Sequence, residues 1–483
     1  MDVSGRRESM DRERKLFRST IVLMLGLILP RAVALITIKF ISEGVVKGDY
    51  GNYNVMTNIV LNLFIPIVTL QIGEGIFRFL IDSDEKKSNY YISSALSYLV
   101  VAIIMTIVAF FLFTFDGFEG QLKYIIIIYA VVELINIYIR PIARGLGHNK
   151  VYSISGIITA IINLITCYLF VIVWELGVVG LLYSVILSDI VGLIYMIWKV
   201  KLHNFFGIAF VRKEAFLKLL GYSIPLIPNL IAWYILTLSD QLIIKWFINE
   251  DAVGIYSMAA KIPSIITMIY HGFNMAWQES AARSLNDQDV NKYYSKMLFN
   301  LTRVLTAGTI GLIAFTPVVF ALMISGAEYA SAYSYIGLMI LTAFLNCIST
   351  YYGSLYIASK DTKGISISSV VAAVVNIIIH LALIRFIGLY AAVISTVVAY
   401  IVLVLYRVID IQKNYFKLHY YKRLIIICSV GLVISLILFA LGENSKIIMY
   451  GNMIYSVVFA LFLCGDIGLN IIKTIIRKLR KSV

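Results

Sequence analysis

Charged residues are scarce in this chain. Aspartate, glutamate, lysine and arginine make up 14% of its 483 residues, whereas hydrophobic residues make up 60%. A soluble domain usually has about 25% charged and about 45–50% apolar residues. The mean hydropathy of +0.88 agrees with this comparison. The composition therefore indicates a polytopic membrane protein rather than an ordinary soluble domain.

The sequence has no cysteine, histidine or nucleotide-binding motif typical of a metal, redox or ATP site. The four cysteines are scattered through apolar runs without metal or redox spacing, so we interpret them as packing residues: Cys167, Cys347, Cys428 and Cys464. The five histidines form no ligand cluster, and no P-loop sequence occurs. The sequence therefore predicts no metal site, no cofactor, no catalytic residues and no ATP binding of the usual kind.

The chain consists mainly of long apolar runs. A helix needs roughly 20 apolar residues to cross the bilayer core, and about fourteen such runs occur. The strands of a membrane barrel would instead be short segments of alternating hydrophobicity. We therefore expect an all-α fold with about fourteen transmembrane helices. Their approximate limits are 16–41, 51–80, 90–115, 122–145, 151–174, 178–199, 219–248, 254–281, 294–325, 332–358, 365–386, 388–409, 423–442 and 447–470.

The formal net charge of +14 is distributed unevenly among the connections. Lysine and arginine concentrate in the N-terminal head, in alternate connections and in the C-terminal tail. The other connections hold little beyond Lys47, Lys123 and Lys446. Because cytoplasmic connections carry this excess in membrane proteins, we expect both termini to face the cytoplasm. No folded basic domain presents these charges, which argues against a nucleic-acid partner.

The chain contains an internal repeat. The segment KVYSIS, from Lys150 to Ser155, corresponds to KGISIS, from Lys363 to Ser368, and each reaches an asparagine at the same spacing. The period covers six spans, so the halves should have the same orientation around a pseudo-two-fold axis along the membrane normal, with a substrate site between them. The predicted parts are a cytoplasmic head (1–15), an N-lobe (16–218), a C-lobe (219–422), two additional helices (423–470) and a basic tail (471–483).

Two neighbouring spans contain residues that a simple membrane anchor would avoid. Proline frees backbone carbonyls, and ionisable groups inside a membrane are costly unless they are paired or face a polar cavity. The stretch from Gly221 to Glu279 is therefore interpreted as part of a transport path. It carries Pro225, Pro228 and Asp240 in its first span, and Lys261, Pro263 and Glu279 in its second.

Three charged residues lie deep inside the predicted spans. Arg31 lies about ten residues from the outer end of the first span, ~15 Å deep at 1.5 Å per residue, and is expected to face a cavity. Asp240 and Lys261 fall at similar depth on neighbouring helices. They are interpreted either as a structural ion pair or as a switchable charge in the cavity.

Other charges in the spans have local explanations as well as functional ones. Glu74 and Arg78 are one helical turn apart, and so are Glu279 and Arg283, which favours local pairing. The functional alternative for Glu74 and Glu279 is a charge in the cavity or a role in coupling. Arg303 lies well inside the ninth span and is a second candidate for the cavity. The acids Glu133, Asp189 and Asp466 have no obvious partner in the sequence, so each could bind a coupling cation.

The chain resembles the bacterial polysaccharide or O-antigen flippases of the Wzx type. The resemblance rests on SIPLIPNLIAWYILTLSDQLIIKWF, GIYSMAAKIPSII and FNMAWQES, and on GNYNVMTNIVLNLFIPIVTLQIGEGIFR and RGLGHNKVYSISG. It extends over essentially the whole chain and is weakly specific for any one substrate. These flippases, the lipid II flippases and the multidrug and toxin extruders form one exporter superfamily.

The resemblance implies two six-helix lobes and two further helices around a central cavity. Family members move undecaprenyl-diphosphate-linked oligosaccharides to the outer leaflet of the bacterial cell membrane, and relatives hold the diphosphate with cations on the first, second and eighth helices. Arg31, Arg78 and Lys261 occupy matching places. Lys261 stands where the lipid II flippases carry arginine, and a lysine binds phosphate as a point charge without arginine's bidentate contact. Membrane lipid, a polysaccharide polymerase and a coupling cation are the further partners that this reading allows.

Two alternatives remain open. A cation-coupled multidrug extruder of the same superfamily would have unpaired acids such as Glu133, Asp189 and Asp240 in its cavity, with Arg31 turned away. A membrane glycosyltransferase with a polyprenyl-linked donor would need sizeable outer loops, and the predicted outer connections are short. The sequence therefore favours a transporter over an enzyme.

Overall fold

The computed structural model describes residues 30–81, 83–112, 121–359 and 363–481. All regular structure in these residues is helical, which confirms the predicted all-α class. The predicted head (1–15) and the first part of the first span lie outside the described residues. Residues 30–44 form a helix that belongs to the predicted first span.

The described chain divides into two compact units between Leu242 and Ile243. This point lies inside a helix, later than the predicted lobe boundary at residue 219. The first unit contains, after the helix over 30–44, α2 (Lys47–Ile59), η1 (Val60–Phe64), α3 (Ile65–Val68), α4 (Ile72–Ile81), α5 (Glu85–Leu112), α6 (Gln121–Gly145), α7 (Asn149–Cys167), η2 (Tyr168–Val173), α8 (Gly177–Val200), η3 (Leu202–Asn204), η4 (Ile208–Phe210), α9 (Lys213–Ser223), η5 (Ile224–Leu226) and most of α10 (Ile227–Phe247).

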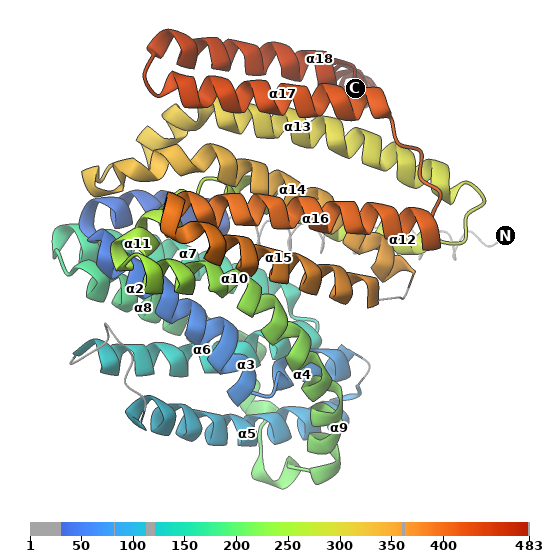
Figure 1. Cartoon of the computed structure of the whole chain (residues 1–483). Helices are drawn as coiled ribbons and strands as arrows, with labels where there is room; N and C mark the ends of the chain where they lie inside the picture. Colours follow the sequence, from blue (N-terminus) through green and yellow to red (C-terminus); the bar gives the residue numbers. More distant parts are fainter. Residues whose placement is uncertain (1–29, 82, 113–120, 360–362, 482–483) are drawn as a thin grey trace. The chain divides into compact units, whose positions relative to one another are not determined.

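The second unit begins with the end of α10. It continues with α11 (Glu250–Ala259), α12 (Ser264–Arg283), α13 (Val290–Met323), η6 (Ala327–Ala332), α14 (Tyr333–Ala358), α15 (Lys363–Ile387), α16 (Leu389–Asn414), α17 (Lys422–Gly442) and α18 (Lys446–Lys481). The helix α18 continues beyond the predicted fourteenth span into the predicted tail. It packs with α17 against α13 (Figure 1).

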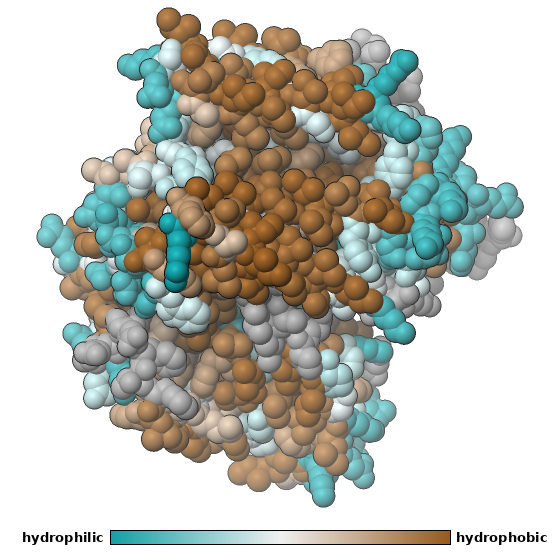
Figure 2. All heavy atoms as spheres, in the orientation of Figure 1, coloured by the Kyte–Doolittle hydropathy of each residue, from teal (hydrophilic) through white to brown (hydrophobic). Residues whose placement is uncertain are grey.

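Ten helices in the described residues are long and apolar enough to cross a membrane, or twelve if each of two bent pairs counts as one span. These twelve match twelve of the predicted spans. The predicted span at 16–41 is only partly described, and the one at 219–248 is not among the twelve. The number fourteen therefore stays a prediction. On the face drawn in Figure 2, hydrophobic residues cover most of the helices, as expected for surfaces that contact lipid.

The two bent spans occupy corresponding places in the predicted halves. In the first unit, the chain turns by 65° between α3 and α4. There Leu70 and Gln71 adopt φ of 50° and 55°, a region that side-chain-bearing residues rarely occupy. In the second unit, the chain turns by 50° between α11 and α12, and Pro263 directly precedes α12. Backbone breaks of this kind fit membrane proteins only where protein or a cavity satisfies the freed groups.

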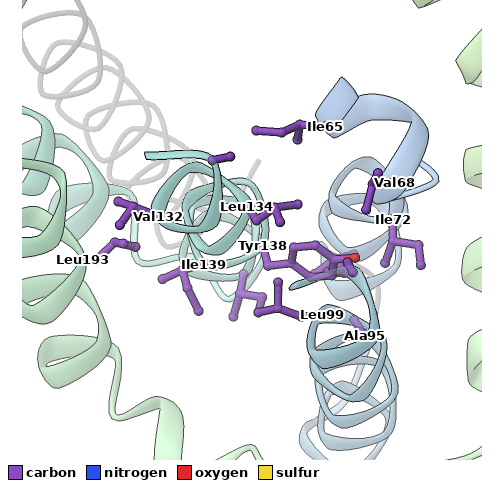
Figure 3. Packing of buried hydrophobic residues seen from close by; sticks show 14 of the residues in the cluster. Ile65, Val68, Ile72, Ala95, Leu99, Val132, Leu134, Tyr138, Ile139 and Leu193 are labelled. Atoms are coloured by element: carbon purple, nitrogen blue, oxygen red, sulfur yellow. The ribbon is translucent and has the colours of Figure 1, made fainter. Parts of the chain in front are cut away.

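Helix α6 lies at the centre of the first unit's core. Figure 3 shows Tyr138 extending from α6 toward Ile72 of α4 and Leu99 of α5. Gly73 lets α4 approach α6 closely, since a Cβ atom there would lie 2.6 Å from the Ile137 carbonyl oxygen. The core therefore fixes the position of α4, which carries Glu74 and Arg78.

An aromatic cluster holds α12, α13 and α14 together in the second unit. The buried Trp277 stacks on Tyr351 with ring centroids 4.9 Å apart, and its ring also meets Tyr294 edge-on. The Tyr294 hydroxyl donates to the Ala281 carbonyl, and the Tyr351 hydroxyl donates to the Tyr294 carbonyl. Stacked rings with satisfied hydroxyls form a rigid core beneath α12.

Candidate functional site

A cavity of about 340 Å³ lies in the first unit among the helix over 30–44, α6, α7 and α8. Arg31 from the first of these helices and Arg140 from α6 supply its positive charge. Asp189 from α8 supplies a negative one. Hydroxyl and amide groups complete its polar lining: Tyr152, Ser155, Thr159, Asn163 and Ser188. The cavity therefore combines a cationic wall with many hydrogen-bonding groups.

The charges in this cavity are partly paired. One guanidinium nitrogen of Arg140 lies 3.1 Å from a carboxylate oxygen of Asp189, and Asp189 is nearly buried whereas Arg140 is 42% exposed. Glu133 lies beside Asp189 and Asn136. Arg31 forms no ion pair with another of the described residues, and its side chain is exposed at the cavity. An arginine placed in this way can donate to an anion that enters.

Sequence reasoning missed Arg140. It lies five residues from the end of the span at 122–145, where a basic residue is ordinarily explained as snorkelling. Its spacing of seven residues from Glu133 was an available signal, because residues seven apart share one face of a helix. That spacing accounts for the placement of Glu133 and Arg140 beside Asp189.

The other predicted residues of the first unit lie elsewhere. Glu74 and Arg78 are exposed on α4, directly after the 65° break. Asp240 is buried in α10. None of these three residues lines the cavity that contains Arg31. Their predicted roles therefore stay predictions.

In the second unit, Lys261 lies in the break between α11 and α12 and is half-buried. Because Asp240 and Lys261 fall on different sides of the division between the units, the predicted ion pair also stays a prediction. Glu279 forms an ion pair with Arg283 one turn further along α12, with both side chains well exposed. This confirms the local pairing predicted for them.

Arg303 of α13 contacts α18, the second of the two helices that follow the predicted repeat. Its guanidinium donates to the Leu463 carbonyl at 2.6 Å and forms a two-nitrogen ion pair with Asp466, both on α18. Asp466, which had no obvious partner in the sequence, thus acquires one. These contacts join α13 to α18 and give Arg303 a structural role.

Long apolar helices in two units, each with one bent span, define a multi-pass membrane protein. The chain belongs to the family described as polysaccharide biosynthesis protein, whose match covers residues 16–278, more than half of its length. The family identified from the sequence motifs is thereby confirmed.

Solved structures share the fold at low sequence identity. The inward closed conformation of the lipid II flippase MurJ has a TM-score of 0.70 at 15% identity, covering 92% of this chain and 99% of that chain. An inward-facing MATE-family multidrug resistance transporter of the MOP superfamily has a TM-score of 0.66 at 15% identity, covering 81% and 98%. A MOP superfamily transporter from Pyrococcus furiosus has a TM-score of 0.56 at 15% identity, covering 82% and 95%. No curated protein sequence matches the chain.

Proposed function

We propose that the protein is a flippase that moves an undecaprenyl-diphosphate-linked oligosaccharide from the cytoplasmic to the outer leaflet by alternating access. The product would enter the synthesis of a capsule, an exopolysaccharide or another cell-surface polysaccharide. Membership of the polysaccharide biosynthesis family and a fold shared with a lipid II flippase support this reading. The observation that carries it is the exposed Arg31 at a cavity rich in hydroxyl and amide groups.

The chemistry of that cavity suits a diphosphate joined to a sugar. Arginine donates pairs of hydrogen bonds to phosphate oxygens, and such charge-assisted bonds are strong where little water is present. Arg140 offers a second guanidinium, although its ion pair with Asp189 must loosen before it can turn to a phosphate. Lys261, in the break between α11 and α12, and Arg78, on α4 after the break of the other bent span, are the further cations we assign to the diphosphate.

The membrane potential favours the proposed direction. In a cell that is negative inside, outward movement of an anion gains ~2.3 kcal/mol per charge per 100 mV. We infer that the chain lies in the bacterial plasma membrane, or inner membrane, with both termini in the cytoplasm. A polysaccharide polymerase would then receive the product on the outer side.

A cation-coupled multidrug extruder is the second candidate. The MATE-family neighbour supports it, and so do the acids Glu133 and Asp189, which lie together beside the cavity. Asp189 is already paired with Arg140, however, and Arg31 lines the same cavity. Unneutralised arginine repels a cationic drug, so these charges favour an anionic cargo. In the flippase, Glu133 and Asp189 would instead serve a coupling cation.

The test is transbilayer movement in proteoliposomes that contain a labelled undecaprenyl-diphosphate oligosaccharide. We expect Arg31→Ala and Lys261→Ala each to slow movement about 10- to 100-fold, because a hydrogen bond to a charged group contributes about 1.5–3 kcal/mol. Arg283→Ala is the matched control, since it removes one positive charge from an exposed pair with Glu279. Equal slowing by all three variants, with unchanged melting temperatures, would contradict the assignment of the site.

A further inference from the structure

The second unit contains a cavity of a different chemical kind. It has a volume of about 230 Å³ and lies where α11 and α12 meet at the 50° bend, opposite α14 and α16. Six of the eleven residues that line it have a polar but uncharged side chain: Tyr256, Ser264, Thr267, Thr342, Asn346 and Thr396. The remaining lining residues are apolar, and none of the described residues that line it is charged.

Three hydroxyl groups in this lining are positioned to accept hydrogen bonds. Each donates its hydrogen to a backbone carbonyl three or four residues earlier in the chain. The pairs are Ser264 with Lys261, Thr267 with Ser264, and Thr342 with Leu338. A hydroxyl whose hydrogen is used in this way still has a lone pair to offer. The wall therefore presents acceptors for O–H donors.

Asn346 and Tyr256 add the complementary features. The Thr350 hydroxyl donates to the Asn346 backbone carbonyl at 2.8 Å and lies 3.3 Å from the Asn346 side-chain oxygen, and the NH2 group of the same amide is a hydrogen-bond donor. Tyr256 contributes an aromatic ring to the same lining. Acceptors, an amide donor and an apolar ring face match a sugar ring, which has hydroxyls around its edge and C–H groups on its faces.

Other ligand classes fit this cavity less well. A diphosphate needs cations, and the lining has none among the described residues. A divalent cation prefers carboxylate ligands, which are also missing from this lining. The volume lies just below the usual range of small-molecule pockets, about 300–1,000 Å³, and so suits one sugar unit rather than a whole oligosaccharide.

We propose that this cavity binds one neutral sugar unit of the cargo and thereby contributes to the choice of oligosaccharide. This inference rests on the proposed flippase function and assigns a part of the cargo to the second unit. Ala260 and Pro263, which flank the segment containing Lys261, both line the cavity. The sugar would thus lie beside the lysine that we assign to the diphosphate.

The test compares the binding of two purified lipids to the detergent-solubilised full chain. One is undecaprenyl diphosphate, and the other is the same lipid carrying the oligosaccharide extracted from the cells that make the protein. Wild type should bind the glycosylated lipid more tightly. We expect Asn346→Leu and Thr342→Val each to weaken that binding about tenfold, as loss of roughly one hydrogen bond to the sugar implies, and to leave bare-lipid binding unchanged.

Two controls separate a sugar site from general packing. Thr309→Val makes the same change as Thr342→Val at a buried threonine of α13 outside this lining, and it should alter neither affinity. Lys261→Ala should weaken the binding of both lipids equally. Thr342→Val conserves shape, so it keeps the test informative if Asn346→Leu does not fold.

The possible failures are distinguishable. If wild type binds the two lipids equally, or if Asn346→Leu and Thr342→Val weaken both lipids alike, the sugar site is wrong while the flippase proposal survives. If wild type binds neither lipid, the proposed function fails and the sugar site fails with it.

Discussion

Arg303 illustrates how a charge inside an apolar helix can serve assembly. Its side chain is 12% exposed and reaches both the Leu463 carbonyl and the Asp466 carboxylate on α18. The sequence predicted a cavity role for Arg303 because depth alone cannot tell a partner on another helix from a ligand. The two paired residues are 163 positions apart, so no local spacing rule connects them.

We expect Arg303→Ala to lower the free energy of unfolding by about 1.5–3 kcal/mol, since it removes hydrogen bonds made by a charged group. Asp466→Asn should cost less, because Arg303 keeps the Leu463 carbonyl as a partner. Thermal unfolding in detergent, read separately for each variant, measures the difference. Equal stability of wild type and Arg303→Ala would show that α18 does not depend on this contact.

At the scale of the helices, α6 was predictable from the sequence, whereas the bend between α3 and α4 was not. Apolar length and hydrophobicity were enough to predict this helix and most others, because every transmembrane helix must satisfy its own backbone. The bend between α3 and α4 was not predictable, since Leu70 and Gln71 are not residues that favour positive φ. The surrounding core holds them there, and that core depends on contacts between α4, α5 and α6 that a single sequence does not reveal.

Tyr138 of α6 provides a test of that core. Its side chain is fully buried, and its hydroxyl has no hydrogen-bond partner among the described residues. We expect Tyr138→Phe to leave stability unchanged or to raise it by about 1 kcal/mol, because it removes an unsatisfied polar group. Tyr138→Ala should lower stability by about 3–5 kcal/mol through the cavity that it creates. Chemical or thermal unfolding of the two variants measures these changes in stability. A larger loss of stability for Tyr138→Phe than for Tyr138→Ala would contradict this packing.

At the scale of the whole molecule, the two units carry cavities of different chemistry. The first is lined by Arg31, Arg140 and Asp189, and the second by hydroxyl, amide and aromatic groups. The sequence predicted the family, the helical class and Arg31 as a candidate. It could not predict the second cavity, because serines, threonines and asparagines are ordinary residues of apolar helices and only packing shows which of them converge.

The most direct test of the central claim is to give the reconstituted wild-type protein two cargoes in parallel. One is a fluorescent undecaprenyl-diphosphate oligosaccharide, scored by its exposure to an impermeant reagent, and the other is a cationic dye with a proton or sodium gradient. The flippase proposal predicts movement of the lipid-linked oligosaccharide, faster with a potential negative on the cytoplasmic side, and no gradient-driven dye export. Dye export without movement of the lipid would contradict it and identify a multidrug extruder.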